Sequence, residues 1–292
     1  MGSTPGVGIL LNPGLADSLD RALQRVAFAP IIPDRLWNSI DPQSGYRRIP
    51  SAWAMVRCAA ERAEIPLHGI GLSVGSAGRL DRTYLDAMLG LAEELRSPWI
   101  SDHLSFVHLQ DHGDLSPAAA LPVPYDAESL AFLTDKVGEI VRASPVPFLL
   151  ENPAYYIRYP EQDFSEPAFL NEICRRTGAG LLFDLHNLVC NVRNLGFDPW
   201  TYLEEIDWSR VLEIHVAGGS EMHGFWTDSH TGGCDPAVVD LLPIALARAV
   251  NLRSVTFEFH EASFPLLGEA GVLEELDRIA ECIGSTTEVG AT

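Results

Sequence analysis

The sequence is almost without lysine and is short of basic residues in general. Lys136 is the single lysine, and 20 basic residues face 40 acidic ones, which leaves a formal net charge of -20 over 292 residues. A protein that binds phosphate backbones or anionic lipid surfaces needs a basic face. The charge balance therefore argues against nucleic acid and against a membrane surface as partners.

Cysteines and long apolar runs are also scarce. The five cysteines are an odd number without CxxC spacing, so they indicate reduced thiols rather than a disulfide framework. Apolar stretches such as VPFLL and GLLF are far shorter than the roughly 20 residues of a membrane-spanning helix. The start MGSTPGVG lacks the charged segment of a secretory signal. We therefore expect a cytoplasmic protein.

The sequence does contain a regular alternation of short apolar segments and longer segments with helical spacing. The apolar segments start roughly 35 residues apart on average, which matches a (β/α)8 barrel of about 250 residues. We predict an α/β fold, a single (β/α)8 TIM barrel, with one domain over residues 1–284 and a flexible C-terminal tail over 285–292. The eight predicted strands span residues 7–12, 27–32, 64–70, 99–106, 148–152, 180–187, 211–218 and 254–260.

A doubly wound open sheet has the same alternation but needs a glycine-rich phosphate turn after its first strand. The segment NPGLADS that follows the first predicted strand is no GxGxxG motif, and the glycines at 69–78 lack a ribose-binding acid in the right context. The barrel is therefore preferred. Two connections, 34–50 and 108–126, are longer than a barrel requires, and such loops usually cover or shape a site.

Histidines and acids gather where the predicted strands end. Catalytic residues of a barrel lie at the carboxyl ends of its strands, and an acid in a strand such as FLLEN is costly to bury without a compensating cation. Imidazole with carboxylate suits zinc, iron or manganese, and so many ligands exceed the needs of one ion. We expect a metal-dependent catalytic domain with two or three ions. The residues concerned are His68, Asp102, His103, Glu151, Asp184, His186, Asn187, His215, Asp228, His230, Glu258 and His260.

Within the sixth predicted strand, Asn187 is favoured as a ligand, and His186 is either a ligand or a hydrogen-bond partner of one. Cys190 and Cys234 lie near the same rim but have no partner at metal-site spacing, so both are interpreted as buried hydrophobic residues. His223 lies close enough to the predicted site to be an acid, a base or a substrate contact there. The remaining histidines, His108 and His112, are expected to face solvent.

Several of these segments together resemble a known family. The segments HGIGLS, SDHLS, LENPAYY, FDLHN, RNLGFDP, EIHVAG, the DSH step and FEF are similar to those of the multinuclear non-haem iron-dependent oxidative enzymes (MNIO), which include the methanobactin biosynthesis oxidase. The order of the ligand types also resembles the trinuclear site of the xylose-isomerase and endonuclease-IV-like TIM barrels. The resemblance runs from about residue 68 to 260.

This resemblance implies a TIM barrel with two to three iron ions, Fe(II)/Fe(III), and with O2 as co-substrate. Its substrate would be a ribosomal precursor peptide, modified at Cys, Asp or Asn, with a separate partner protein that recognises the leader peptide. Asp228, His230 and Glu258 would hold the reactive ion. Carried over by position, the metal ligands would be His68, His103, Glu151, Asp184, Asn187, His215, Asp228, His230 and Glu258.

The chain also departs from the family's usual pattern. The family commonly has a second Asn where this chain has His186, and an acid where it has His260. The first two predicted strands lack the family's early signature. These departures leave metal binding in place and bear on the substrate and the reaction outcome.

Three other functions are compatible with clustered ligands on a barrel. One is a zinc-dependent phosphodiesterase of the endonuclease-IV kind, with metal-generated hydroxide as nucleophile; the net charge argues against DNA as its substrate. Another is a metal-dependent sugar isomerase or epimerase, although the single lysine lies in a predicted helix. The last is a non-catalytic metal store.

Overall fold

The computed structural model describes residues 4–41, 45–107 and 121–289. Its centre is a sheet of seven parallel strands in the order β1-β13-β10-β9-β8-β5-β4. Each strand is short and buried on both faces, as expected when helices cover the outside of a closed or curled parallel sheet. The strands are β1 Gly6–Ile9, β4 Leu67–Gly69, β5 Ile100–His103, β8 Phe148–Glu151, β9 Gly180–Asp184, β10 Val211–Ala217 and β13 Ser254–Glu258.

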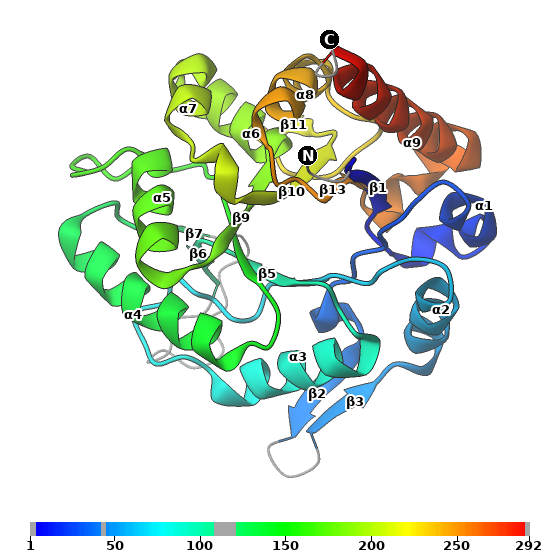
Figure 1. The fold of residues 1–292 in the computed structure, drawn as a ribbon, viewed down its shortest axis with the longest axis horizontal. Coiled ribbons are helices and arrows are strands. Elements are labelled where there is room, and N and C mark those ends of the chain that lie inside the picture. Colours follow the sequence, from blue (N-terminus) through cyan, green and yellow to red (C-terminus); the bar gives the residue numbers. More distant parts are fainter. Residues whose placement is uncertain (1–3, 42–44, 108–120, 290–292) are drawn as a thin grey trace.

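The predicted second strand, 27–32, lies between the two edges of this sheet. Its Phe28 forms parallel bridges with Gly8 and with Glu64, and Ile31 forms one with Leu67. Pro30 has no amide hydrogen to donate, which keeps the pairing to isolated bridges. Because these bridges join β1 to β4, the segment occupies the eighth position and the sheet curls into the ring seen in Figure 1. The predicted TIM-barrel architecture is confirmed.

Helices surround this ring (Figure 1) and begin with recognisable caps. Asp81, Asp126 and Ser165 each accept a hydrogen bond from an amide in the first turn of the helix that follows, which satisfies one of the free amides there. The helices are α1 Leu19–Leu23, α2 Pro50–Ala60, α3 Arg82–Leu95, α4 Ala127–Ala143, α5 Glu166–Thr177, α6 Leu185–Leu195, α7 Pro199–Glu205, α8 Pro236–Arg248 and α9 Phe264–Val289.

The sixth predicted strand was too long. Its strand part, β9, ends at Asp184, and helix α6 begins at Leu185 with Asp184 as its cap. The apolar run continues across this boundary, so periodicity alone did not mark it. His186 and Asn187 therefore lie in the first turn of a helix, and their assignment to the predicted strand 180–187 is wrong.

Short hairpins and 3-10 turns lie outside the seven-stranded sheet. The predicted loop 34–50 contains a hairpin of β2 Trp37–Asp41 and β3 Gly45–Arg48, and a second hairpin joins β11 Ser220–Met222 to β12 Phe225–Thr227. Most of the predicted loop 108–126 lies outside the described residues, and β6 Ser105–Phe106 pairs with β7 Leu121–Pro122 at its ends. The short 3-10 turns are η1 Pro13–Leu15, η2 Pro33–Arg35, η3 Trp208–Arg210 and η4 Glu261–Ser263.

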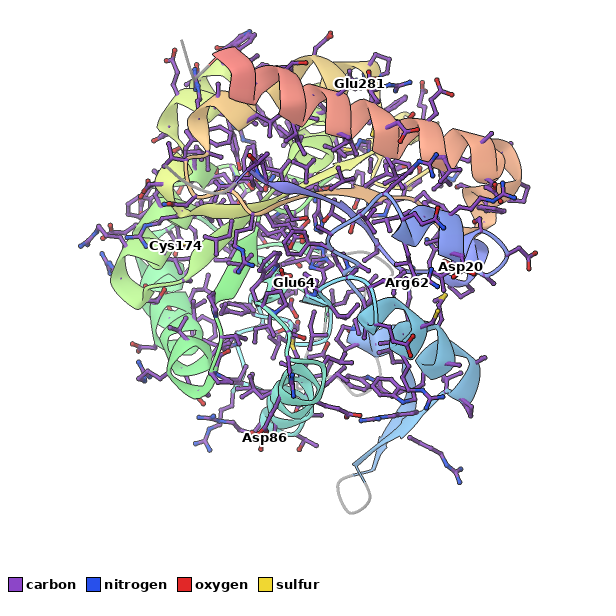
Figure 2. All side chains as sticks on the ribbon, turned by 45° about the vertical axis from the view of Figure 1, so that its right-hand side comes forward. Asp20, Arg62, Glu64, Asp86, Cys174 and Glu281 are labelled. Atoms are coloured by element: carbon purple, nitrogen blue, oxygen red, sulfur yellow. The ribbon has the colours of Figure 1, made fainter. Side chains whose placement is uncertain are left out.

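The last helix, α9, extends to Val289 and so includes the first residues of the segment 285–292 that was expected as a tail; residues 290–292 lie outside the described part. Figure 2 shows Arg62 beside Asp20 on the outside of the barrel, where a 2.8 Å ion pair links the turn after α2 to α1. No helix among the described residues is long and apolar enough to span a bilayer.

Candidate metal centre

The carboxyl ends of β4, β5 and β8 bring two histidines to one glutamate. Glu151 Oε2 lies 3.3 Å from His68 Nε2 and 3.2 Å from His103 Nε2. The other ring nitrogen of His68 is 3.0 Å from Ser101 Oγ, which fixes the ring with Nε2 toward the carboxylate. These three residues end neighbouring strands of the sheet, so parallel pairing places them at one rim.

Asp184 and Asn187 lie next along this rim, at the junction of β9 and α6. Asp184 Oδ1 caps the helix by accepting from the Asn187 amide at 2.7 Å. The Asn187 side chain donates to Glu151 Oε1 at 3.3 Å, which leaves its own Oδ1 free to act as a ligand. Asn152 holds the Asp184 backbone through hydrogen bonds of 2.8 and 2.9 Å. The end of β9 is therefore fixed against the end of β8.

His215 on β10 lies between two glutamates. Its Nδ1 is 3.2 Å from Glu258 Oε1 at the end of β13, and its Nε2 is 3.3 Å from Glu213 Oε1 deeper in the barrel. Glu213 is itself held by Trp99 Nε1 at 2.6 Å and by the Thr256 hydroxyl at 2.8 Å. With Nε2 facing Glu213, Nδ1 is the nitrogen that points toward the rim.

Asp228 and His230 come from the loop after β12 and complete the cluster. His230 Nε2 lies 2.7 Å from Asp228 Oδ1 and 3.3 Å from Glu258 Oε2. His230 has a positive φ of 49°, which a non-glycine residue adopts only where its surroundings hold it. The backbone amide of His260 donates to the His230 carbonyl at 2.9 Å and anchors this turn to the end of β13.

The structure therefore brings all the predicted ligands to one rim. Two overlapping groups, which share His215, have every ligand atom within 4.8 Å of the others and could each hold an ion: His68 with Glu151 and His215, and Asp184 with His215 and Glu258. Imidazole nitrogens and carboxylate oxygens in such groups are a donor set that suits zinc, iron or manganese.

Unpaired polar atoms provide a separate test of whether metal ions fit. Among the described residues, 14 buried side-chain atoms have no hydrogen-bond partner, and eight of them belong to the predicted ligands. Buried polar atoms are normally paired, and each exception requires an explanation such as an ion. The eight are Glu151 Oε2, Asp184 Oδ2, Asn187 Oδ1, His215 Nδ1 and Nε2, Asp228 Oδ1, His230 Nε2 and Glu258 Oε1.

Three of the ligand acids have shifted pKa values, and two of these shifts are upward. Burial, then the nearby Asp184 and Glu258, raise the pKa of Glu151 well above its usual range. Burial and the charge of Asp228 raise the pKa of Asp184 to about 7. Asp228 is the exception, because burial is outweighed by His230, whose imidazolium lowers the pKa of Asp228. A bound cation would stabilise all of these carboxylates in their charged form.

The histidines divide into two pairs. Burial and the charge of His103 lower the pKa of His68, and burial lowers that of His103. Burial also opposes the charged forms of His215 and His230, but neighbouring carboxylates outweigh it and raise their pKa values to about 9 and about 10. Without metal, protons on the second pair neutralise the acids. Metal ions would replace these protons, since a ligating imidazole is neutral.

Three further histidines considered in the sequence analysis lie outside the set of predicted ligands. His260 is 44% exposed at its side chain and accepts a hydrogen bond from the Ala262 amide, so it caps the turn η4. His223 lies exposed at the tip of the β11–β12 hairpin. His186 is fully buried, 3.8 Å from Asp228 Oδ1 and 3.4 Å from Cys190 Sγ, so it lies beside the predicted ligands.

Of the remaining residues, Asp102 accepts hydrogen bonds from the Leu72 and His103 amides and therefore supports the backbone of the rim. Cys190 is buried, as predicted, and Cys234 is half-buried. His108 and His112 lie outside the described residues.

Sequence reasoning missed Glu213 and Asn152, which hold His215 and Asp184 in place. A signal for Glu213 was present, because Glu213 and His215 are two apart in the strand VLEIH and must point to the same face. For Asn152 the sequence offers no comparable signal.

Comparisons with known proteins agree with this geometry. The sequence model described as RiPP precursor modification enzyme MbnB/TglH/ChrH matches residues 6–283. A UPF0276 protein of Caulobacter vibrioides is 34% identical over 194 residues, 66% of this chain and 68% of that protein. One of Streptomyces avermitilis is 32% identical over 99% of this chain, which spans only 56% of that protein.

Solved structures support the fold alone, because their sequences are distant. The IOLI protein with a bound zinc atom has a TM-score of 0.61 at 14% identity, covering 96% of this chain and 99% of that one. Endonuclease IV from Thermus thermophilus has a TM-score of 0.54 at 16% identity, covering 93% and 100%. An L-ribulose 3-epimerase has a TM-score of 0.56 at 12% identity, covering 98% and 95%.

Proposed function

This chain belongs to the family of RiPP precursor modification enzymes MbnB/TglH/ChrH, and we propose that it is a multinuclear non-haem iron-dependent oxidoreductase. A RiPP is a ribosomally made peptide that is modified after synthesis, so the substrate is a precursor peptide. In the proposal the enzyme binds two to three iron ions, uses O2 as co-substrate, and alters a Cys, Asp or Asn residue of that peptide.

The observation that carries this proposal is the cluster of unpaired ligand atoms. The residues that would hold the ions are the nine predicted ligands, and two compact groups among them already have the spacing of ion sites. When bound, iron(II) with open coordination positions would supply O2 activation and a place for a substrate thiolate or carboxylate. The protein's part is to hold these ligands and to exclude water.

Exposure differs across the cluster and indicates where the substrate enters. The side chains of His103, Asp228 and His230 are 21%, 26% and 22% exposed, whereas those of Glu151 and Glu258 are 2% and 3% exposed. An incoming peptide therefore meets the first three residues before the others. This supports the assignment of Asp228 and His230, with Glu258 behind them, to the reactive ion.

Residues around the cluster hold these groups in their working orientation. Glu213 Oε1 lies 3.3 Å from Nε2 of His215 and favours a proton on that nitrogen, so that Nδ1 keeps its lone pair toward the rim. The Tyr156 hydroxyl accepts from the Asp228 amide at 3.2 Å and leaves its own proton available at the entrance. Tyr156 is half-buried beside Phe225, with 5.7 Å between ring centroids.

The proposal includes a separate partner protein that recognises the leader peptide. The described residues form one barrel with its connecting loops, and none of these loops forms a second folded unit for binding a leader. The catalytic domain of the proposal is residues 1–284. A net charge of -20 favours a peptide over a nucleic acid as the substrate.

Metal analysis of protein purified without oxygen tests the function. Two to three iron atoms per chain, together with O2 consumption that depends on a precursor peptide, are the expected result. Stoichiometric zinc with hydrolysis of a phosphodiester would replace the proposal by the endonuclease-IV-like alternative. Sugar epimerisation without O2 uptake would replace it by the epimerase alternative.

A further inference from the structure

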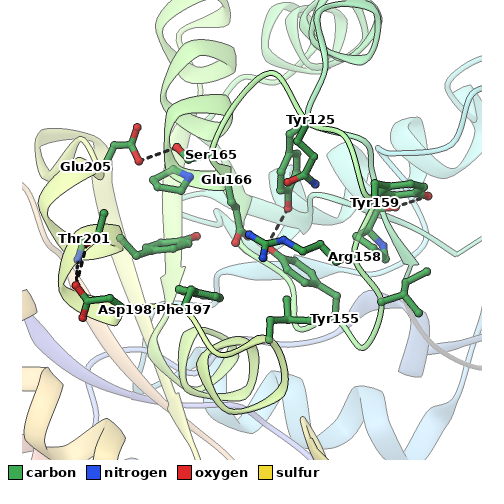
Figure 3. A pocket seen from close by; sticks show the side chains of 16 residues that line it. Tyr125, Tyr155, Arg158, Tyr159, Ser165, Glu166, Phe197, Asp198, Thr201 and Glu205 are labelled. Carbon is green, nitrogen blue, oxygen red and sulfur yellow. Dashed lines mark hydrogen bonds between the residues drawn. The ribbon is translucent and has the colours of Figure 1, made fainter.

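A cavity lies along the segment that follows β8. It has a volume of about 300 Å3 and is enclosed by residues before α4, the β8–α5 connection, the start of α5, and α7. Figure 3 shows Tyr125, Tyr155 and Arg158 near Glu166, and Asp198 and Glu205 farther to one side. The cavity lining includes Tyr125, Tyr155, Arg158, Glu166 and Tyr202.

Glu166 is the buried acid of this cavity, and the polar groups that hydrogen-bond to it are tyrosine hydroxyls. It is 7% exposed, and the hydroxyls of Tyr155, Tyr202 and Tyr125 stabilise its charged form, although burial outweighs them. The Tyr125 hydroxyl donates to that of Tyr155 at 2.9 Å, so these rings present hydroxyls and aromatic faces to the cavity. A buried carboxyl group without a cation is unfavourable.

The charges around the cavity favour a cationic ligand. Its lining includes the carboxyl groups of Glu166, Asp198 and Glu205 against one guanidinium, that of Arg158. Arg158 is exposed, and within the described ranges no ion pair joins it to these acids. Aromatic faces attract cations further. An anionic ligand would instead meet three carboxyl groups.

The cavity and the metal centre share one short segment of chain. Glu151 belongs to the metal centre and Tyr155 lines the cavity, so the two are four positions apart in the sequence, and their Cα atoms lie at most about 14 Å apart. The next residue, Tyr156, contacts the Asp228 amide through its hydroxyl. A single extended peptide can therefore occupy both places, with a few residues between its reacting residue and the cavity.

We propose that this cavity binds the side chain of a lysine or arginine of the precursor peptide, with the cationic head beside Glu166 and the apolar stem between the tyrosines. The proposal rests on the proposed peptide-modifying function. It adds a specificity site that selects peptides with a basic residue near the modified position. Arg158 would move aside when the peptide's cation enters, since both have the same charge.

Small probes test the cavity without knowledge of the peptide. N-acetyl-arginine and N-acetyl-lysine methylamides are titrated into the metal-loaded protein by calorimetry, with the neutral citrulline and the anionic glutamate analogues as comparisons. The cationic probes should bind at least about tenfold more tightly than citrulline, as expected for a charge-assisted contact. Tighter binding of the glutamate analogue, or no binding of either cationic probe at millimolar concentration, overturns the proposal.

Three variants sharpen the test. Glu166→Gln should weaken binding of the arginine probe at least about tenfold, while Glu172→Gln, on the outer face of the same helix, should leave it unchanged. Arg158→Gln should strengthen binding of the arginine probe, because a competing positive charge is removed. Equal binding by the Glu166→Gln and wild-type proteins contradicts the proposal, as does loss of binding on substituting Arg158.

Proton release is an independent readout. Burial raises the pKa of Glu166 to about 8, so a cation that binds beside it at pH 7 should drive a proton off. Calorimetry in buffers of different ionisation enthalpy measures this release, which should vanish in Glu166→Gln; its absence in the wild type opposes the proposal.

Two controls separate the possible failures. If agmatine, which has no peptide backbone, binds at least about tenfold more tightly than the acetylated probe, the ligand is a free amine and the peptide assignment fails. Iron content and O2 uptake are measured on the same samples. Intact iron without probe binding refutes the cavity alone, whereas probe binding without iron refutes the proposed function.

Discussion

Two regions of this barrel bury carboxyl groups, and they manage that burial differently. In the candidate metal centre, imidazole nitrogens contact the oxygens of Glu151 and Glu258, and Asp184 lies within 4.8 Å of His215 and Glu258. In the neighbouring cavity, Glu166 lies among tyrosines without a basic partner within the described part of the chain. Both regions lie on the side of the barrel where the strands end.

The difference shows how the neighbours of an acid decide what it can bind. Imidazoles can lose their protons and become ligands, so acids and histidines together can hold metal ions. Tyrosine hydroxyls keep their protons, and burial then keeps Glu166 protonated, with its pKa raised to about 8. The first arrangement suits transition-metal ions, and the second suits an organic cation with an apolar stem.

The largest expected effect comes from removing a ligand at the metal centre. Replacing His103 or Glu151 with Ala should remove metal while the barrel stays folded, with a loss of affinity beyond the roughly 10- to 100-fold typical of an outer partner. Elemental analysis measures the metal and far-ultraviolet circular dichroism measures the fold. Full metal occupancy in either variant would contradict the ligand assignment.

A smaller effect on metal affinity is expected from Glu213, which contacts the predicted ligand His215. Glu213→Gln keeps the size of the side chain but weakens the hold on His215 Nε2, so metal affinity should fall roughly 10- to 100-fold. Competition with a chelator measures this affinity. Glu64→Gln is the matched control, because Glu64 is 51% exposed and pairs with Arg253 on the outside. An unchanged affinity in Glu213→Gln would show that His215 does not depend on Glu213.

The pH dependence of stability separates the two regions further. The folded-state pKa of Glu166 is raised from 4.5 to about 8, so folding is penalised increasingly as pH rises from about 5 to about 8 and the unfolded chain loses its proton first. The penalty is at most roughly 5 kcal/mol, at 1.36 kcal/mol per pKa unit. Glu166→Gln should therefore raise the melting temperature at pH 8.5 and change it little at pH 5. An equal change in melting temperature at pH 8.5 and at pH 5 would show that Glu166 does not titrate in this way.

The smallest effect is expected at His260. Its side chain caps η4 and is 44% exposed, so His260→Ala should leave the metal content unchanged and reduce stability by about 1 kcal/mol, as for other lost caps. Elemental analysis and thermal melting check both parts. A loss of metal would show that His260 is a ligand in addition to the nine predicted ones.

Much of the fold and of the metal centre could be predicted from the sequence. Parallel strands end at one rim, so His68 and Glu258, 190 positions apart, could be assigned to the same site. The start of α6 at Leu185 could not be placed, because an apolar run crosses it. For the same reason His186 was assigned to a strand.

The cavity around Glu166 was out of reach of sequence reasoning. Its walls come from residues near 125, 155–167 and 195–205, and these are connections and helix starts without a shared period. Glu166 has the sequence signature of an ordinary acid in the first turn of a helix. Only the packing of three tyrosines over it makes this acid unusual.

The central claim is that cations hold the imidazoles and acids of the rim together. Anomalous diffraction at the iron edge, from crystals grown without oxygen, tests it most directly. The account predicts two or three iron peaks among the predicted ligands, each within bonding distance of histidine and carboxylate atoms. Crystals of iron-loaded protein without a peak there, and with His230 Nε2 still in contact with Asp228 Oδ1, would contradict it.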